Sequence, residues 1–441
     1  KLIQYNENKK REERLAFIES YDSLTQLPNY KKFLSLSEEY RKEHPEKKFF
    51  CTYSDFSNFQ YLNEIYGFAV GNEVLYGFAA ALRERCEGIV YASHINADHF
   101  LVLHEGEEIK KLCYSFEQMT KEYCEKISQL YPLCKLFLVS GISEVKPEAC
   151  DITYYIDNAN VARKTAKGRG ETCCVEFANS MKRQIEKQME LTDSMQHALD
   201  HEEFAVYLQP KISLKEERIV GAEAFVRWIK GDGTILRPDE FIPLFEKNGF
   251  IKQIDFRVLE QVLAMLRQQL NRGEQVVPIS VNFSRQSQED EEFVEHILAC
   301  LNYYQISPKL IQAEIAESTY LYDLKILDEN RKQLRRNGIS ISIDDFGAGY
   351  SSLNILSKVS ADVIKLDQQF LEESRRGKMT PEFMKYLVMM IKQLGFAIIA
   401  EGVETKEQVQ MLKEAGCDQA QGYYYARPMP VKEFLEYLEK N

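Results

Sequence analysis

Polar side chains stand on or directly after six strand-like segments in the C-terminal half of this 441-residue sequence. The segments are rich in Ile, Val and Ala, and the polar residues that they carry are Glu223, Asn282, Glu314, the adjacent pair Asp344 and Asp345, Lys365 and Glu401. In a closed barrel, side chains at the carboxyl ends of the strands converge on one mouth. The pattern therefore predicts one pocket that contains five carboxylates, one amide and one lysine.

Such a group of carboxylates repels itself unless cations compensate its charge. Oxygen ligands of this kind favour Mg²⁺ or Mn²⁺, and the pair Asp344 and Asp345 would serve two ions at once. Two metal ions about 4 Å apart bind a phosphodiester, produce hydroxide from water and stabilise the leaving oxygen. Lys365 would hold the attacking water or neutralise the developing charge. Arg227 shares a strand face with Glu223 and would bind a phosphate.

A simpler interpretation exists for each residue taken alone. An aspartate or asparagine after a strand is usually a helix cap or a solvated loop residue, and a cap or turn role is the favoured interpretation of Asn282 by itself. Six strand segments that all carry metal-type ligands or a lysine are hard to assign to caps. The joint pattern favours the metal site.

Alternating strand and helix patterns surround these residues. Strands are expected at 204–210, 219–228, 276–283, 310–317, 339–345, 363–367, 397–401 and 418–422, and helices at 255–272, 289–302, 324–337, 380–394 and 406–415. This alternation over about 250 residues predicts a parallel sheet closed into a TIM-like (β/α)8 barrel.

The N-terminal part mixes the two patterns differently. Strands are expected at 48–55, 89–95, 100–104, 133–142 and 172–177, and helices at 71–85 and 151–164. A sheet with helices on one face is the architecture that we expect for this α+β domain. The predicted division is a connector helix at 1–20, the α+β domain at 21–178, a stiff linker helix at 179–190 and the barrel at 191–441.

Composition narrows the class of protein. The net charge of −12 argues against a partner that is polymeric nucleic acid. The ten cysteines include no CxxC pair, so reduced thiols in a cytoplasmic protein are expected rather than a zinc finger or a disulfide framework. The sequence contains no run of about 20 apolar residues, so no membrane span is predicted. The sequence begins at Lys1 with a charged helical pattern, which suggests tethering by an upstream domain outside this sequence.

The run Ala222-Glu223-Ala224-Phe225-Val226-Arg227-Trp228 resembles the signature of EAL-domain cyclic di-GMP phosphodiesterases, with Phe225 in place of a leucine. The resemblance extends over 191–441 and includes Leu208-Gln209-Pro210, Ser280-Val281-Asn282-Phe283-Ser284, Glu314-Ile315-Ala316-Glu317, Ile343-Asp344-Asp345-Phe346-Gly347, Val363-Ile364-Lys365-Leu366-Asp367, Ala400-Glu401-Gly402-Val403-Glu404 and Gln421-Gly422-Tyr423.

The resemblance implies hydrolysis of cyclic di-GMP to the linear dinucleotide pGpG by two Mg²⁺ or Mn²⁺ ions. It matches Glu223, Asn282, Glu314, Asp344, Asp345 and Glu401 to metal ligands, Lys365 to the catalytic lysine, and Gln209, Arg227 and Gln421 to substrate contacts. Glu317 matches a glutamate that steadies the loop after Asp345, and the family implies a homodimer formed through the barrel. Phe225 and Ala348 depart from the family, but neither removes a ligand.

The run from Asp22 to Asn29 and the run from Asn63 to Asn72 resemble GGDEF-type diguanylate cyclase domains, which have a cyclase-palm fold. Several functional positions differ. Asn96, Ala97 and His99 occupy the naming motif, Ser57 and Asn72 replace aspartates, and Glu87 and Val90 fall where an inhibitory RxxD motif would lie. Glycines in that motif let a backbone approach phosphates. We therefore expect a degenerate domain without cyclase activity that serves as a spacer and dimerisation module or as a regulatory GTP pocket.

Three functions are compatible with the barrel sequence. The favoured one is a cyclic di-GMP phosphodiesterase, because every ligand and the lysine are present. A receptor that binds cyclic di-GMP without cutting it and signals through the N-terminal helix is the main alternative. A protein scaffold is a third, although it would not need the pocket.

Overall fold

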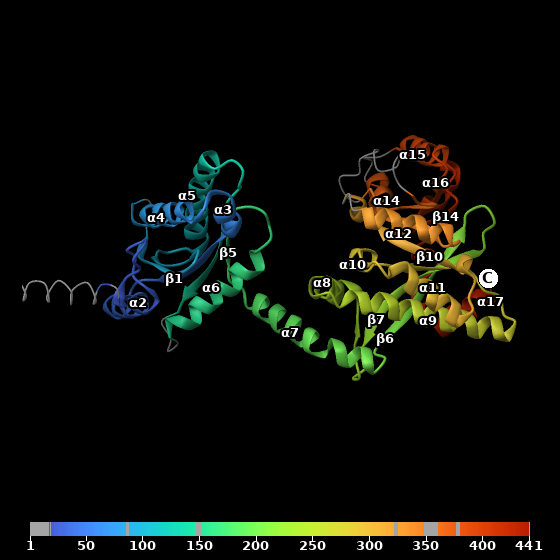
Figure 1. The fold of residues 1–441 in the computed structure, drawn as a ribbon, viewed down its shortest axis with the longest axis horizontal. Coiled ribbons are helices and arrows are strands. Elements are labelled where there is room, and N and C mark those ends of the chain that lie inside the picture. Colours follow the sequence, from blue (N-terminus) through green and yellow to red (C-terminus); the bar gives the residue numbers. More distant parts are fainter. Residues whose placement is uncertain are drawn as a thin grey trace, which may run out of the picture. The chain divides into compact units, whose positions relative to one another are not determined.

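The computed structural model describes residues 17, 19–84, 88–146, 151–321, 325–347, 360–375 and 380–440. The chain divides into two compact units, Lys1–Lys187 and Gln188–Asn441. Helix α7 (Asn179–Asp200) begins in the first unit and ends in the second (Figure 1). Almost all of the predicted connector helix lies outside the described residues, as do Glu87 and Ala348.

The first unit is built on a sheet with strand order β2-β3-β1-β4-β5. Its elements in chain order are α2 (Tyr30–Glu43), β1 (Phe49–Ser57), α3 (Phe59–Tyr66), α4 (Phe68–Glu84), β2 (Ile89–Asn96), β3 (His99–Glu105), α5 (Ile109–Leu130), β4 (Phe137–Val145), α6 (Ile152–Ala166) and β5 (Cys173–Glu176). The predicted hairpin is present as β2 and β3, and β5 closes the sheet by pairing in parallel with β4.

Helices cover both faces of this sheet, so the expectation of helices on one face was wrong. Phe50 of β1 packs in a core with α4 and α5, whereas its neighbours Phe49 and Cys51 pack in a second core with α2 and α6. Successive residues of a strand point to opposite faces. The nearly continuous burial of β1, which includes polar residues such as Thr52 and Asp55, is thus that of a strand covered on both sides.

The second unit contains the closed eight-stranded barrel that the sequence predicts. Its strands in barrel order are β6 (Phe204–Ser213), β7 (Ile219–Ile229), β9 (Ile279–Asn282), β10 (Ile311–Ala316), β11 (Ser340–Phe346), β12 (Val363–Leu366), β13 (Ala397–Ala400) and β14 (Gln419–Ala420). The short strands β8 (Ile235–Leu236) and β15 (Met429–Pro430) extend the sheet beside β7 and β6.

One barrel strand runs against the others, which corrects the expectation of a wholly parallel sheet. Strand β6 pairs antiparallel with both β7 and β14, whereas the other neighbouring barrel pairs are parallel. The connection from Ser213 to Ile219 is a tight turn, and a parallel crossover needs a dozen or more residues. The first two strands therefore form a hairpin.

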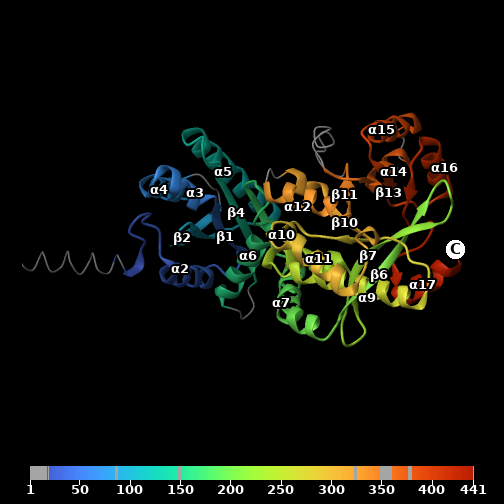
Figure 2. The same cartoon turned by 45° about the vertical axis from the view of Figure 1, so that its right-hand side comes forward.

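Helices pack around the outside of the barrel (Figures 1 and 2). They are α8 (Pro238–Asn248), α9 (Ile251–Arg272), α10 (Arg285–Gln288), α11 (Phe293–Tyr304), α12 (Lys325–Arg336), α14 (Gln368–Arg375), α15 (Pro381–Gln393), α16 (Lys406–Ala415) and α17 (Val431–Lys440), with single turns η1 (Pro308–Leu310) and η2 (Glu317–Leu321). None of the helices in the described part of the chain is long and apolar enough to cross a bilayer.

An aromatic cluster closes one side of the barrel core. Trp228 is fully buried against Phe204, Phe241 and Phe245, and its indole N–H donates a 2.8 Å hydrogen bond to Glu203 Oε2. Trp228 is the only tryptophan of the sequence. Its fluorescence therefore reports on the barrel and not on the first unit.

Replacing Phe245 by Ala should lower the free energy of unfolding of the barrel by about 3 to 5 kcal/mol, because it removes a fully buried ring from the centre of this cluster. Urea unfolding followed by Trp228 fluorescence measures the change. Tyr303→Ala, on an 81 % exposed residue of α11, is the control and should change the value by less than about 0.5 kcal/mol. Equal effects of the two substitutions would contradict the assigned core.

Candidate functional site

The ammonium group of Lys365 lies at the centre of the predicted pocket. Lys365 is fully buried on β12, and its Nζ lies 3.0 Å from Glu223 Oε2, 2.7 Å from Glu314 Oε2, 2.8 Å from Asp344 Oδ1 and 2.8 Å from Glu401 Oε1. These carboxylates belong to β7, β10, β11 and the residue after β13. The barrel thus brings together side chains that are far apart in the sequence.

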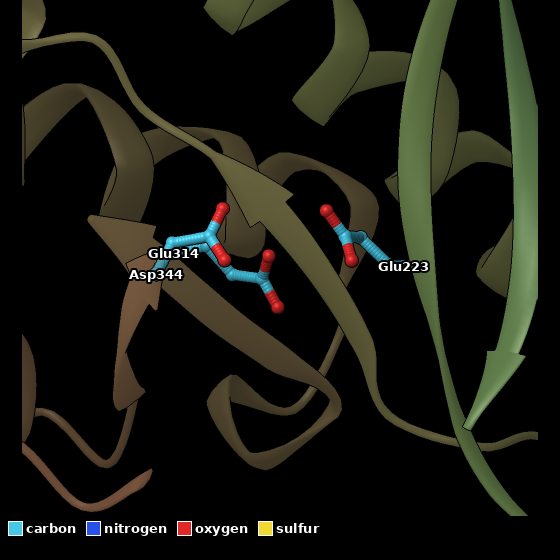
Figure 3. A group of neighbouring side chains, drawn as sticks. All are labelled: Glu223, Glu314 and Asp344. Carbon is cyan, nitrogen blue, oxygen red and sulfur yellow. The ribbon is translucent and has the colours of Figure 1, made fainter. Parts of the chain in front are cut away.

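The carboxylates form two groups that share one member. Single oxygens of Glu223, Glu314 and Asp344 lie within 4.8 Å of one another, and so do single oxygens of Asp344, Asp345 and Glu401. Figure 3 shows Glu314 and Asp344 pointing toward the side chain of Glu223, which comes from β7 on the opposite side. All the donors are hard oxygens, as Mg²⁺ and Mn²⁺ prefer. The residues present therefore fit divalent cations, and Asp344 belongs to both groups that could hold one.

Electrostatics separates the ionised groups of the site from those that hold protons. Burial disfavours the charge of Lys365, but Asp344, Glu223, Glu314 and Glu401 outweigh it and raise its pKa well above the usual value. Burial also opposes ionisation of Glu314, yet Lys211 and Lys365 outweigh it and hold the pKa of Glu314 far below its usual range. This lysine–carboxylate core is therefore charged.

Three other carboxylates of the site have raised pKa values. Burial, with the negative charge of Glu314, raises the pKa of Glu223 to about 7 against the opposing effect of Lys365. Burial raises the pKa of Glu401 to about 8, and burial together with Asp344 raises that of Asp345 to about 6. Protons relieve the repulsion here, and divalent cations would replace them.

Asn282 ends β9 and meets this cluster from one side. Its Nδ2 donates a 2.9 Å hydrogen bond to Glu223 Oε1, and it stands opposite Glu314 in the register of β9 and β10. Asp255 of α9 holds the turn that follows, because its Oδ2 accepts hydrogen bonds from Ser284 N at 2.8 Å and from Ser287 Oγ at 2.7 Å. Asn282 is thus fixed beside the carboxylates.

The end of β11 has an unusual backbone. Asp345 has φ +54°, in the left-handed region that favours glycine. Gly347 follows with φ +99°, and a Cβ there would lie 2.1 Å from the ring of Phe370. Its N–H donates a 3.0 Å hydrogen bond to Glu317 Oε2. Glu317 therefore holds the backbone at Gly347, directly after β11.

The predicted substrate contacts differ in their positions. A cavity of about 300 Å³ is lined by Gln209, Glu223, Phe225, Asp344, Asp345, Asp367, Gln368, Glu401, Gly402, Glu404, Gln421, Gly422 and Tyr423. Gln421 Nε2 donates to Gln209 Oε1 at 2.9 Å and to Glu223 Oε2 at 2.8 Å. Gln209 and Gln421 thus lie in the described wall of this cavity, whereas Arg227, the third predicted substrate contact, does not. The guanidinium group of Arg227 packs on the rings of Tyr207 and Phe225.

Three residues of the site were missed by the sequence analysis. Asp367 and Glu404 line the cavity, and Lys211 contacts Glu314 from inside the barrel. The strand period was the available signal, because Asp367 follows Lys365 by two residues and Lys211 follows Gln209 by two.

A second cavity lies in the first unit. It measures about 1240 Å³, and its wall includes Asp22, Ser57, Asn72, Ala97 and Asp98. Asp98 Oδ2 accepts a 3.0 Å hydrogen bond from the backbone N–H of Phe56.

Asp55 of β1 is buried in this unit and ion-paired. Arg163 Nη1 lies 2.5 Å and Lys167 Nζ 2.9 Å from Asp55 Oδ2. Two cationic side chains thus compensate the charge of this carboxylate.

The comparisons with known proteins agree with both units. The family model described as "EAL domain" matches residues 192–428, and the model described as "Diguanylate cyclase, GGDEF domain" matches residues 19–173. The predicted tandem of GGDEF and EAL domains is confirmed.

Curated relatives cover most of the chain. The bifunctional diguanylate cyclase/cyclic di-GMP phosphodiesterase MucR of Pseudomonas aeruginosa is 28% identical over 421 residues, which cover 94% of this chain and 61% of MucR. The cyclic di-GMP phosphodiesterase PdeR of Escherichia coli is 26% identical, and the match covers 98% of this chain and 65% of PdeR. The chain thus spans less than two thirds of the length of these relatives.

Solved structures resemble the barrel and the tandem. The PaMucR phosphodiesterase in complex with c-di-GMP is 32% identical, covers 56% of this chain and 99% of its own, and has a TM-score of 0.53. The S helix-GGDEF-EAL part of Vibrio cholerae LapD, bound to c-di-GMP, covers 95% of this chain and 99% of its own at 18% identity and a TM-score of 0.52. The LapD likeness concerns the fold alone.

Stability should depend on pH through Asp255, whose pKa burial raises from its usual value to about 7. A carboxyl group whose pKa is higher in the folded than in the unfolded state stabilises the folded protein most at pH values below its pKa in the unfolded state. This contribution to the free energy of unfolding is lost as the pH rises to the pKa of the folded state. From about pH 4 to pH 8 the chain should therefore lose about 2 to 4 kcal/mol of unfolding free energy relative to Asp255→Asn. Urea unfolding across this pH range measures the difference.

The exposed Asp239 of α8 provides the matched control. Asp239→Asn should follow the pH dependence of the unmodified chain. A constant difference between the unmodified chain and Asp255→Asn over the whole pH range would show that Asp255 does not titrate as described.

Proposed function

Since the chain belongs to the EAL domain family, we propose that its barrel hydrolyses cyclic di-GMP to linear pGpG in a reaction that depends on Mg²⁺ or Mn²⁺. The observation that carries the proposal is the contact of Lys365 with four carboxylates, of which Asp344 also groups with Asp345 and Glu401. The likeness to a phosphodiesterase in complex with c-di-GMP supports the substrate.

Each part of the reaction has a candidate group. Glu223, Asn282, Glu314, Asp344, Asp345 and Glu401 would hold two cations, which supply a nucleophile from water and stabilise the leaving oxygen. Lys365 lies among these ligands and would orient the attacking water or neutralise charge on the phosphate. Gln209 and Gln421 stand in the cavity wall, where they would contact the dinucleotide.

Glu223→Ala should lower the hydrolysis of cyclic di-GMP by at least about 100-fold, because it removes a ligand that also contacts Lys365, Asn282 and Gln421. Chromatography of the products after incubation with Mg²⁺ or Mn²⁺ measures the loss, and a chelator should abolish turnover of the unmodified chain. Glu216→Ala, in the exposed turn between β6 and β7, is the matched control and should keep full activity. Full turnover by Glu223→Ala would contradict the assignment.

The alternative function, a receptor that binds without cutting, gives a different result in the same experiment. A receptor would bind cyclic di-GMP at equilibrium but release no linear product with either metal. The complete set of ligands around Lys365 favours the enzyme, because a receptor needs no nucleophile.

We propose that the GGDEF domain has no cyclase activity and acts as a regulatory or dimerisation module. Asp55 is compensated by Arg163 and Lys167, and Ala97 occupies the turn of the hairpin with φ +48°. The cavity of about 1240 Å³ leaves room for a nucleotide such as GTP.

Incubation of the whole chain carrying Glu223→Ala, whose barrel would not consume cyclic di-GMP, with GTP and Mg²⁺ should therefore yield no cyclic di-GMP. Phosphodiesterase assays with and without GTP test the regulatory role, since a regulatory nucleotide would change the rate of hydrolysis. Formation of cyclic di-GMP from GTP would contradict the inactive assignment.

A homodimer formed through the barrel is also proposed. Helix α15 exposes Phe383, Tyr386 and Met389 at helical spacing, and a second copy of the chain would cover this apolar stripe.

The eight described cysteines are unpaired, which fits the proposed cytoplasmic location, where thiols stay reduced.

Tyr386→Lys combined with Met389→Lys should convert the proposed dimer into a monomer, because charges would replace the centre of the stripe. Light scattering coupled to gel filtration measures the mass. A dimer that persists in this variant would place the interface elsewhere.

A further inference from the structure

Lys211 is a second buried lysine of the barrel, on the opposite side of Glu314 from Lys365. It belongs to β6, the antiparallel strand, and is 3 % exposed. Its Nζ donates hydrogen bonds to Glu314 Oε1 at 2.6 Å, to Gln312 Oε1 at 3.2 Å and to Ser280 Oγ. All three donor positions of the ammonium group are therefore used inside the barrel.

These contacts form a polar layer beneath the carboxylate cluster. Ser280 Oγ donates to Gln312 Oε1 at 2.7 Å, and Gln312 Nε2 donates to Ser340 Oγ at 3.2 Å. The interior of such barrels is usually filled by branched apolar side chains. A buried ammonium group is unfavourable unless it is paired and hydrogen-bonded, and here both conditions are met.

The two oxygens of Glu314 are divided between the two lysines. Oε1 faces Lys211, and Oε2 faces Lys365 at 2.7 Å. Lys365 is shared among four carboxylates, whereas Glu314 is the sole carboxylate paired with Lys211 in the described part of the chain. Lys211 thus holds Oε1 of Glu314 from the barrel interior, and this contact does not depend on what binds at the mouth of the barrel.

We propose that Lys211 is a positioning residue that acts through Glu314. It is a built-in cation that fixes the Glu314 carboxylate in one orientation and compensates its charge before any divalent cation arrives. The metal-free site is then already arranged, with Oε2 of Glu314 turned toward the mouth. This inference rests on the proposed metal site and assigns part of its preorganisation to β6.

Lys211→Met tests the proposal, because methionine keeps an unbranched stem but removes the charge. Thermal unfolding of the whole chain, followed by Trp228 fluorescence, is measured after chelation and again with saturating Mn²⁺. The Tm of the chelated variant should fall by about 5 to 10 °C, since a buried carboxylate loses a partner. Mn²⁺ should restore part of this loss, so that the gain in Tm on adding Mn²⁺ exceeds that of the unmodified chain.

Two outcomes separate this role from simple packing. A packing role would lower the Tm equally with and without Mn²⁺, and that result would overturn the proposal. Lys215→Met, in the exposed turn after β6, is the matched control and should leave both Tm values unchanged. An unmodified chain that gains no Tm from Mn²⁺ would contradict the proposed metal site itself, whereas a normal gain that Lys211→Met does not enlarge contradicts only the role of Lys211.

A double variant keeps the test decisive if Lys211→Met fails to fold with or without Mn²⁺. Lys211→Met combined with Glu314→Gln removes both charges of the pair, so it should fold and unfold at a higher Tm after chelation than the single variant. A double variant no more stable than Lys211→Met would overturn the proposal, because the unpaired charge of Glu314 would then not be the cause of the loss.

Discussion

The fully buried ammonium group of Lys365 lies within 3.0 Å of four carboxylates, and the mouth of the barrel depends on this arrangement. Like charges at such distances repel strongly in a medium of low polarisability. Burial, together with repulsion that one lysine does not offset, raises the pKa values of Glu223 and Glu401. This unsatisfied demand for positive charge supports the proposed binding of divalent cations.

The reversed first strand adds to this arrangement. Because β6 and β7 form a hairpin, Gln209 stands opposite Glu223 and Lys211 opposite Gly221. A Cβ at Gly221 would lie 3.0 Å from the carbonyl oxygen of Pro278, so the glycine allows this close approach of the backbone. A hairpin thus brings an amide and an ammonium group to the interior beside the carboxylates of the parallel strands.

The sequence predicted the barrel well because its signal is local. Strands of Ile, Val and Ala that lead into polar residues identify both the element and the end that faces the mouth, as for Asp344 and Glu401. The antiparallel direction of β6 follows from the turn before Ile219, which is too short for a parallel crossover, and not from the strand pattern itself. Glu223 lies within β7 rather than at its end, because β7 continues beyond its neighbour β9.

Interior contacts were harder to foresee than strand ends. Lysine usually lies at the surface of a protein. Only the closed barrel shows that Lys211 is an interior residue that contacts Glu314. The two-sided cover of the first sheet was missed for a similar reason, because the apolar run of β1 does not say which helix meets which face.

Two buried ammonium groups also restrict how this barrel can change over evolutionary time. If carboxylates such as Asp344 or Glu401 were replaced by neutral residues, Lys365 and Lys211 would remain and the pocket would carry less negative charge. A less negative pocket holds divalent cations less strongly and repels the phosphates of a dinucleotide less. Loss of a few acidic side chains would thus shift the proposed metal-dependent catalyst toward a metal-free sensor of the same dinucleotide, without a change of fold.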